Sequence, residues 1–217
     1  MYRLKFVVVF LGGMLAFWGF QEYRVSSGAS QEPLTIELSS IEAGEEPENT
    51  YLHIPKHSAL YFSSVYEYEQ SKYSTSEPTP ASKVNHTYYP IISAEHPFNT
   101  LLAKYGDIES VPEGTEFPAP DSFAVLVKTK RFKKIGDIPV GIDPGEEVKG
   151  LLINRISSLG SEEEKLVRET FPNVNVDKLL ILEDGREPSS ALKSMGMMGG
   201  GVVLVLGGLA SFFIGRK

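Results

Sequence analysis

The sequence of 217 residues contains no cysteine. This absence excludes disulfide bonds, thiol nucleophiles and metal sites built on thiolates. It does not identify the cellular compartment, because a domain of this size can hold a hydrophobic core without disulfides.

Positive charge is also scarce. The chain has 21 Lys and Arg residues against 28 Asp and Glu residues, which gives a formal net charge of -7 at pH 7. Every acidic residue lies between positions 21 and 194, and the only charged residues outside this range are Lys and Arg. A nucleic-acid surface needs clustered Lys and Arg to contact phosphates. We therefore expect no nucleic-acid partner, and no adhesion of the acidic middle as a whole to anionic lipid.

Familiar catalytic and nucleotide-binding motifs are missing as well. The chain has no Gly-x-Ser-x-Gly elbow, no His-Glu-x-x-His pair and no phosphate loop. The glycines within 196–201 open an apolar run and follow no strand pattern, so they differ from a nucleotide-binding loop. The sequence identifies no catalytic residue and no cofactor, and it favours a protein that is not an enzyme. An enzyme whose side chains come together from distant positions is the alternative.

The four histidines give little support to a metal site. His53 and His57 lie four positions apart, but Pro55 between them disfavours a helix. On a strand, residues four apart are separated by roughly 13 Å, which is too far for one ion. His86 and His96 fall at a strand edge and in a loop. We therefore predict no metal.

Two apolar runs without charge, 6–21 and 195–214, bracket the chain. A helix needs about 20 apolar residues to cross a bilayer, so both runs are predicted as membrane spans. The first run also fits a signal peptide cleaved near Ser27-Gly28-Ala29. That site lies well beyond the apolar run, so we favour an uncleaved signal anchor.

The charges at the two ends predict the orientation. Lys and Arg flank both spans at the chain ends, and the positive-inside rule places such residues in the cytoplasm. Residues 1–5 and 215–217 are then cytoplasmic, and residues 22–194 form an extracytoplasmic domain, in the periplasm or its equivalent. The lipid bilayer is the first expected partner.

Both predicted spans carry small residues at helical spacing. In lipid, small residues let helix backbones approach closely. We predict that these faces pack against each other or against another membrane protein; the alternative is the general abundance of glycine in membrane helices. The predicted helix-packing residues are Gly12, Ala16, Gly19, Gly196, Gly200, Gly207 and Ser211.

The middle of the chain has a mainly β pattern. Segments 34–38, 60–68 and 88–92 have strand character, and Pro90 favours an edge or bulge position in the last of them. A second group of predicted strands covers 122–132, 147–156 and 177–185.

One soluble helix and one loop complete the prediction. The helix begins with Ser161 and Glu164 in a capping-box pattern and stops at Pro172. The polar segment 69–82 is expected to be a mobile loop. The domain is therefore predicted to be α+β or mostly β, as a small barrel or curled sheet with one or two helices, flanked by two transmembrane helices.

Tyrosines and a basic group suggest a surface for a partner. Tyrosine suits interfaces because its ring is apolar and its hydroxyl can stay hydrated, although most tyrosines are expected in the core. The basic group either remains solvated, protecting a sheet edge, or meets headgroups or an acidic partner. The possible partner surface consists of Tyr61, Tyr66, Tyr68, Lys128, Lys130, Arg131, Lys133 and Lys134.

The layout of two helices around a β-rich domain resembles the SURF1-like assembly factors of respiratory oxidase and membrane proteins of the GIDE-domain type. The cysteine-rich ligase module of some GIDE proteins is absent, and the resemblance assigns no role to any residue. We expect a membrane-anchored accessory or scaffold protein with a membrane or envelope protein partner. The alternatives are an envelope enzyme acting on lipid or cell-wall material, and a sensory domain that signals through the helix pair. The oligomeric state stays open.

Overall fold

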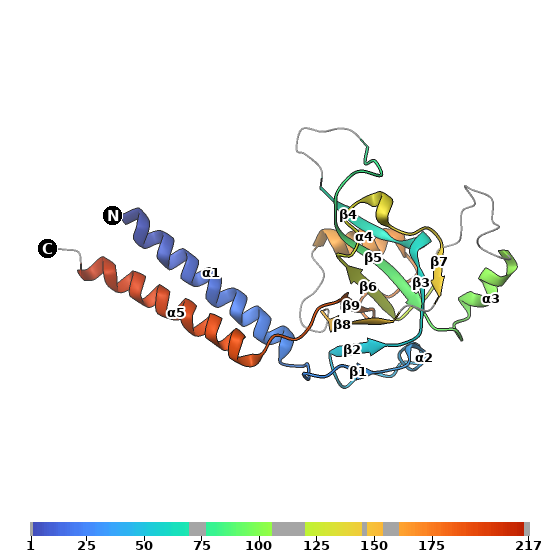
Figure 1. The fold of residues 1–217 in the computed structure, drawn as a ribbon, viewed down its shortest axis with the longest axis horizontal. Coiled ribbons are helices and arrows are strands. Elements are labelled where there is room, and N and C mark those ends of the chain that lie inside the picture. Colours follow the sequence, from blue (N-terminus) through green and yellow to red (C-terminus); the bar gives the residue numbers. More distant parts are fainter. Residues whose placement is uncertain (1, 70–76, 106–119, 145–146, 154–160, 215–217) are drawn as a thin grey trace. The chain divides into compact units, whose positions relative to one another are not determined.

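The structure is a computed structural model that describes residues 2–69, 77–105, 120–144, 147–153 and 161–214. The chain divides into two compact units. One consists of Met1–Gln31 with Pro188–Lys217, and the other of Glu32–Glu187. The first unit contains two long helices, and the second contains a mixed sheet with short helices (Figure 1).

The long helices of the first unit are α1 (Tyr2–Ser26) and α5 (Ala191–Ile214). Both are long and apolar enough to cross a membrane, over Lys5–Ser26 and Ala191–Phe212. The helices run antiparallel, so that α1 begins beside the end of α5 (Figure 1). The two predicted spans therefore correspond to two candidate membrane-spanning helices.

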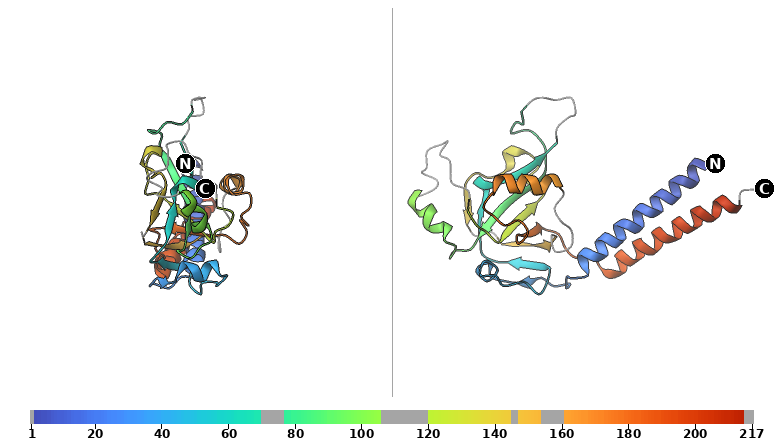
Figure 2. Two further views of the ribbon diagram at one scale, coloured as in Figure 1. Left: turned by 90° about the vertical axis from the view of Figure 1, so that its right-hand side faces the viewer. Right: turned by 180° about the vertical axis from the view of Figure 1, so that it is seen from behind.

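The second unit contains nine described strands in one curled sheet (Figures 1 and 2). Their order is β1-β2-β8-β9-β6-β5-β3-β7, and β4 pairs with β5 beside this path. The β1–β2 and β6–β9 pairs are parallel and the other pairs are antiparallel, so the sheet is mixed. The strands are β1 (Leu34–Thr35), β2 (Tyr51–Ile54), β3 (Ser58–Leu60), β4 (Val65–Tyr68), β5 (Val84–Ile92), β6 (Val125–Thr129), β7 (Ile142–Pro144), β8 (Val148–Leu152) and β9 (Leu180–Asp184).

The second unit also contains short helices. They are α2 (Leu38–Glu42), α3 (Phe98–Leu102), α4 (Ser161–Thr170) and the 3₁₀ turns η1 (Tyr61–Ser63), η2 (Ala103–Tyr105) and η4 (Ile135–Asp137). The α4 helix lies where the capping pattern predicts one, and it ends two residues before Pro172. Arg168 on α4 binds Glu164 and Asp177, and these hydrogen bonds raise the pKa of the guanidinium.

The core consists of two clusters on opposite faces of the sheet. Strand β6 shows the alternation directly: Val125 and Val127 pack in the cluster that includes residues of α2, whereas Leu126 packs in the cluster that includes residues of α3 and α4. All three side chains are fully buried. A central strand buried on both faces explains why this stretch is a continuous apolar run rather than an alternating one.

Pro90 occupies a position that the sequence does not predict. It lies inside β5, opposite Leu126 of β6, and is neither on an edge strand nor at a bulge. On the other side of β5, β4 ends its pairing at Tyr88 and β3 begins at Ile91. The 3₁₀ turn η1 separates these two strands in the chain. Pro90 thus falls where β5 has a ladder partner on one side only, which tolerates a residue without an amide hydrogen.

Strand β8 approaches β9 closely at Gly150. A Cβ atom placed on Gly150 would lie 2.7 Å from the carbonyl carbon of Glu183 and would also overlap its oxygen. Glycine therefore permits this backbone approach where any side chain would force the strands apart.

The predicted mobile loop 69–82 lies partly outside the described residues, which resume at 77. The described end is held by backbone hydrogen bonds. Gly136 donates to the carbonyl of Pro80 at 2.8 Å, and Ile135 donates to the carbonyl of Ser82 at 3.1 Å. This end of the segment therefore packs beside η4.

Candidate functional site

Glycines lie where the backbones of α1 and α5 approach most closely. A Cβ atom on Gly12 would lie 2.8 Å from the carbonyl oxygen of Gly201, and one on Gly19 would lie 2.9 Å from that of Ser194. A Cβ atom on Gly201 would in turn meet the backbone of Ala16. Three of the predicted packing residues, Gly12, Ala16 and Gly19, thus lie at the contact between these helices.

The contact face of α5 differs from the predicted one. Nothing lies within 4 Å of a Cβ atom placed on Gly196, Gly200 or Gly207. The buried positions are instead Ser194, Gly201 and Gly208, which are spaced by seven residues. A seven-residue spacing stays on the seam between two inclined helices, whereas a spacing of four moves away from it. Gly196, Gly200 and Gly207 therefore lie on a neighbouring face of α5, outside its contact with α1.

Polar groups join the two helices at both ends of the pair. The hydroxyl of Ser189 donates to Glu22 at 2.7 Å, and the amide of Ser189 donates to Ser26 Oγ at 2.9 Å. At the other end, Lys5 Nζ donates to the carbonyl of Ser211, the last predicted packing residue. The helix pair is thus held by close backbone contact along its length and by hydrogen bonds at its ends.

The basic group gathers into one exposed patch after β6. Residues 130–134 follow the strand. Lys134 forms an isolated antiparallel β-bridge with Lys83, which lies far away in the sequence. The carboxylate of Asp137 accepts hydrogen bonds from the backbone amides of Lys133 and Lys134, at 3.3 and 3.0 Å, and so fixes the turn. We define the basic patch as Lys83, Lys130, Arg131, Lys133 and Lys134, all of which are exposed.

The other predicted members of the partner surface are distributed differently. Tyr61 is only 3% exposed and belongs to the core, so its assignment to a surface is wrong. Tyr66 and Tyr68 are half-buried on β4, with ring centroids 6.4 Å apart. Lys128 is half-buried on β6, with its ammonium 5.3 Å from the centre of the Tyr88 ring.

Tyr61 connects the core to the basic patch. Its hydroxyl accepts a hydrogen bond of 2.6 Å from Arg131 Nη2, and its ring lies 4.7 Å from that of Tyr89. Burial raises the pKa of the Tyr89 hydroxyl far above its ordinary value, and the nearby Tyr61 and Asp184 raise it further. Asp184 also accepts a hydrogen bond of 3.0 Å from Thr129.

Two histidines bind glutamates across neighbouring strands. His53 Nε2 lies 2.9 Å from Glu147 Oε2, and its Nδ1 lies 3.2 Å from the hydroxyl of Thr35. His86 Nδ1 lies 3.2 Å from Glu67 Oε2. Thr35 and Glu147 come from distant parts of the chain, and no spacing in the sequence connects them to His53. Among the described residues, no group of three or more His, Cys, Asp or Glu side chains is placed to hold a metal ion.

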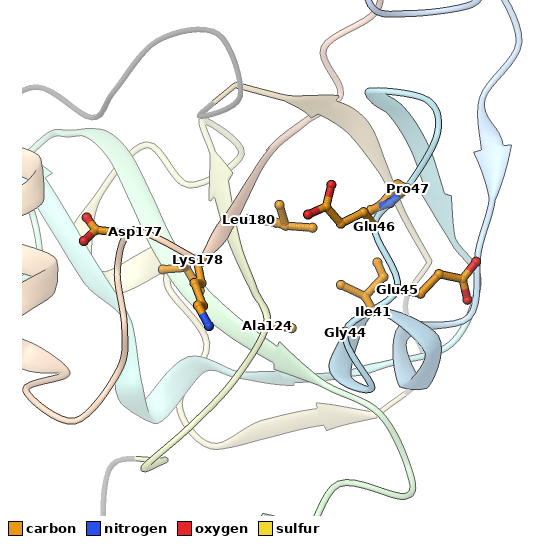
Figure 3. A pocket seen from close by; sticks show the side chains of 10 residues that line it. Ile41, Gly44, Glu45, Glu46, Pro47, Ala124, Asp177, Lys178 and Leu180 are labelled. Atoms are coloured by element: carbon orange, nitrogen blue, oxygen red, sulfur yellow. The ribbon is translucent and has the colours of Figure 1, made fainter.

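A shallow hollow of about 520 Å³ lies at the start of β9 (Figure 3). Its apolar lining includes Ile41 and Leu180, and its charged lining includes Glu46, Asp177 and Lys178. None of the residues predicted for a functional role lines it. With charges of both signs around an apolar base, the hollow has no single chemical preference.

No protein-family model, curated protein or solved structure matches this chain.

Proposed function

We propose that this protein is a membrane-anchored accessory protein whose helix pair holds the acidic β domain at a membrane. The basic patch of that domain binds an acidic region of a membrane or envelope protein. In this proposal the protein acts by positioning its partner.

The helix pair is the observation that carries the proposal. Both helices have the length and composition of membrane spans. Their packing depends on glycine contacts, which suit lipid because no hydrophobic force drives helices together there. Gly196, Gly200 and Gly207 leave a second smooth face on α5, and we propose that this face contacts the membrane-embedded part of the partner.

The basic patch supports an acidic partner. The chain as a whole is acidic, with a formal net charge of -7, so a cluster of five exposed cations is unusual for it. Opposite charges speed association and orient partners, while the acidic remainder of the surface repels other acidic proteins.

The proposed orientation places both chain ends in the cytoplasm and the β domain outside it, following the positive-inside rule. Because the chain has no cysteine, single cysteines introduced at Arg3 and at Gln31 test this without interference. A membrane-impermeant maleimide added to intact cells is expected to label Gln31→Cys and to spare Arg3→Cys. The reverse labelling would overturn the orientation.

The partner is tested by charge reversal. A Lys130→Glu, Lys134→Glu variant is expected to reduce co-purification of the partner from native membranes by about tenfold, because each reversed charge at an interface opposes association. Lys165→Glu with Lys178→Glu changes the net charge by the same amount at two lysines that do not belong to the patch. Equal recovery of a stoichiometric partner with both variants would contradict the role of the patch.

A further inference from the structure

Three side chains from separate parts of the chain form a hydrogen-bonded line near one edge of the sheet. Thr35 Oγ1 lies 3.2 Å from His53 Nδ1. The opposite ring nitrogen, His53 Nε2, lies 2.9 Å from Glu147 Oε2. The line therefore runs from a hydroxyl through an imidazole to a carboxylate.

Strand pairing brings these residues together. Strands β1 and β2 are parallel with Thr35 opposite His53, and the amide of Ile36 donates to the carbonyl of His53 at 3.1 Å. On the other side of β2, strand β8 runs antiparallel and begins one residue after Glu147. The imidazole is thus flanked by one partner on each side.

We propose that Thr35, His53 and Glu147 form an acyl-transfer site that hydrolyses carboxylic esters. The carboxylate beside Nε2 favours the imidazole tautomer with hydrogen on that nitrogen. This leaves the lone pair of Nδ1 to accept the proton of the Thr35 hydroxyl. A nucleophile, a base and a group that orients the base are the three parts of such a site, whatever the fold.

The reaction uses only these groups and water. The oxygen of Thr35 forms a bond to the ester carbonyl carbon while its proton moves to Nδ1 of His53. The bond to the alcohol then breaks, and the departing oxygen takes that proton, leaving Thr35 acylated. Water, deprotonated by the same nitrogen, attacks the acyl carbon and releases the carboxylic acid and the free hydroxyl.

Lys149 carries positive charge on the same face of the sheet as His53. It lies opposite His53 in the β2–β8 ladder, so both side chains lie on one face of the sheet. A hydrogen bond with Tyr51 raises the pKa of the Lys149 ammonium and keeps it charged. We assign Lys149 to stabilise the negative oxygen that develops during attack.

The location of the site indicates how substrates reach it. The side chain of Thr35 is exposed, and that of Glu147 is 73% exposed, so bulky esters have access. Eight residues separate Thr35 from the end of α1. The shared chemistry is a carboxylic ester, and its source is either a lipid or a soluble molecule.

A purely structural role is the competing explanation, because the same contacts join β1, β2 and β8. Thr35→Val separates the two roles, since valine has nearly the same shape and lacks the hydroxyl. Thr35→Ser retains the hydroxyl. Because Thr35 is exposed, neither change is expected to unfold the domain.

The first experiment is covalent labelling of the full chain in nanodiscs with a fluorophosphonate. We expect one adduct, with fluoride as the leaving group, on the peptide that contains Thr35, together with retained labelling in Thr35→Ser. Thr35→Val should abolish labelling, because it removes the oxygen that displaces fluoride. His53→Gln should reduce labelling about 100-fold, the usual contribution of a positioned base. An adduct that persists in Thr35→Val, or no adduct in any form, would overturn the proposal.

The second experiment measures rates with a soluble p-nitrophenyl ester of short chain and with a long-chain p-nitrophenyl ester in phosphatidylcholine vesicles. Faster turnover in vesicles identifies a lipid source, and faster turnover in solution a soluble one. Glu147→Gln should lower kcat and change the pH profile with little effect on KM, because Glu147 is a positioning residue. Rates equal to those of Thr35→Val in both assays would refute the activity.

Discussion

The hydroxyl of Tyr89 shows what burial does to a single group. It lies in the core beside Tyr61, which is linked to the exposed Arg131. Desolvation opposes its ionisation, and its pKa is raised well above that of an exposed tyrosine. The folded state therefore retains a proton that the unfolded chain releases near pH 10, the ordinary value for tyrosine.

This difference predicts a loss of stability in alkali. Above about pH 10 the unfolded state binds fewer protons than the folded state, so the free energy of unfolding falls as the pH rises. Tyr89→Phe should weaken this dependence, at a cost of about 1 kcal/mol below pH 10 for the lost hydrogen bond. The thermal midpoint of the domain, followed by near-ultraviolet circular dichroism between pH 8 and 11, measures both effects. Tyr68→Phe, at a half-buried tyrosine, is the control, and identical slopes in both variants would contradict the account.

Single residues also show the limits of sequence reasoning about the site. The basic run 130–134 was visible in the sequence, but Lys83 was not, because only the bridge to Lys134 brings it there. The prediction of a surface position for Tyr61 is wrong because tyrosine suits both a core and an interface, and composition does not separate the two. Thr35 and Glu147 meet His53 through strand pairing, for which no local pattern exists.

At the scale of elements, the helix pair makes the sharpest prediction. Gly12→Leu or Gly201→Leu should separate α1 from α5, because a side chain at either position would overlap the facing backbone. Such overpacking costs about 1–3 kcal/mol. Gly13→Leu and Gly200→Leu are matched controls, since nothing lies within 4 Å of a Cβ atom at either position.

The measurement is oxidative crosslinking of a Val9→Cys, Gly208→Cys pair, because a Cβ atom placed on Gly208 would lie beside Val9 on the other helix. After proteolysis within the β domain, the two helices stay linked only if the disulfide formed. Linkage should be lost with Gly12→Leu and kept with Gly13→Leu. Equal linkage in both would show that the glycine contact does not hold the pair.

Elements with a strong local signal were predicted well, and those decided by tertiary packing were not. The α4 helix and the apolar strand β6 follow from capping residues and from an uninterrupted apolar run. The expected strand 34–38 instead ends at Thr35, because Leu38 and Ile41 bury their side chains from the helix α2. Alternation of apolar residues does not by itself distinguish these outcomes over so few positions.

At the scale of the whole molecule, the chain consists of two units. One contains the two candidate membrane-spanning helices, and the other contains the β domain. The unit Glu32–Glu187 carries both core clusters and the entire described sheet. A unit with its own core is expected to fold alone. Residues 32–187, produced without the helices, should therefore be soluble without detergent and retain the near-ultraviolet spectrum of the β domain. Aggregation, or loss of that spectrum, would show that the helices are needed for folding.

The spacing of small residues in the helix pair has one more consequence. Because they repeat every seven residues, sliding α5 by about 10 Å would bring Gly208 opposite Gly12 and Gly201 opposite Gly19. The glycines alone accept both alignments. Glu22 meets Ser189 only in the observed one, so the polar residues near the ends, rather than the smooth stripe between them, decide how far the helices overlap.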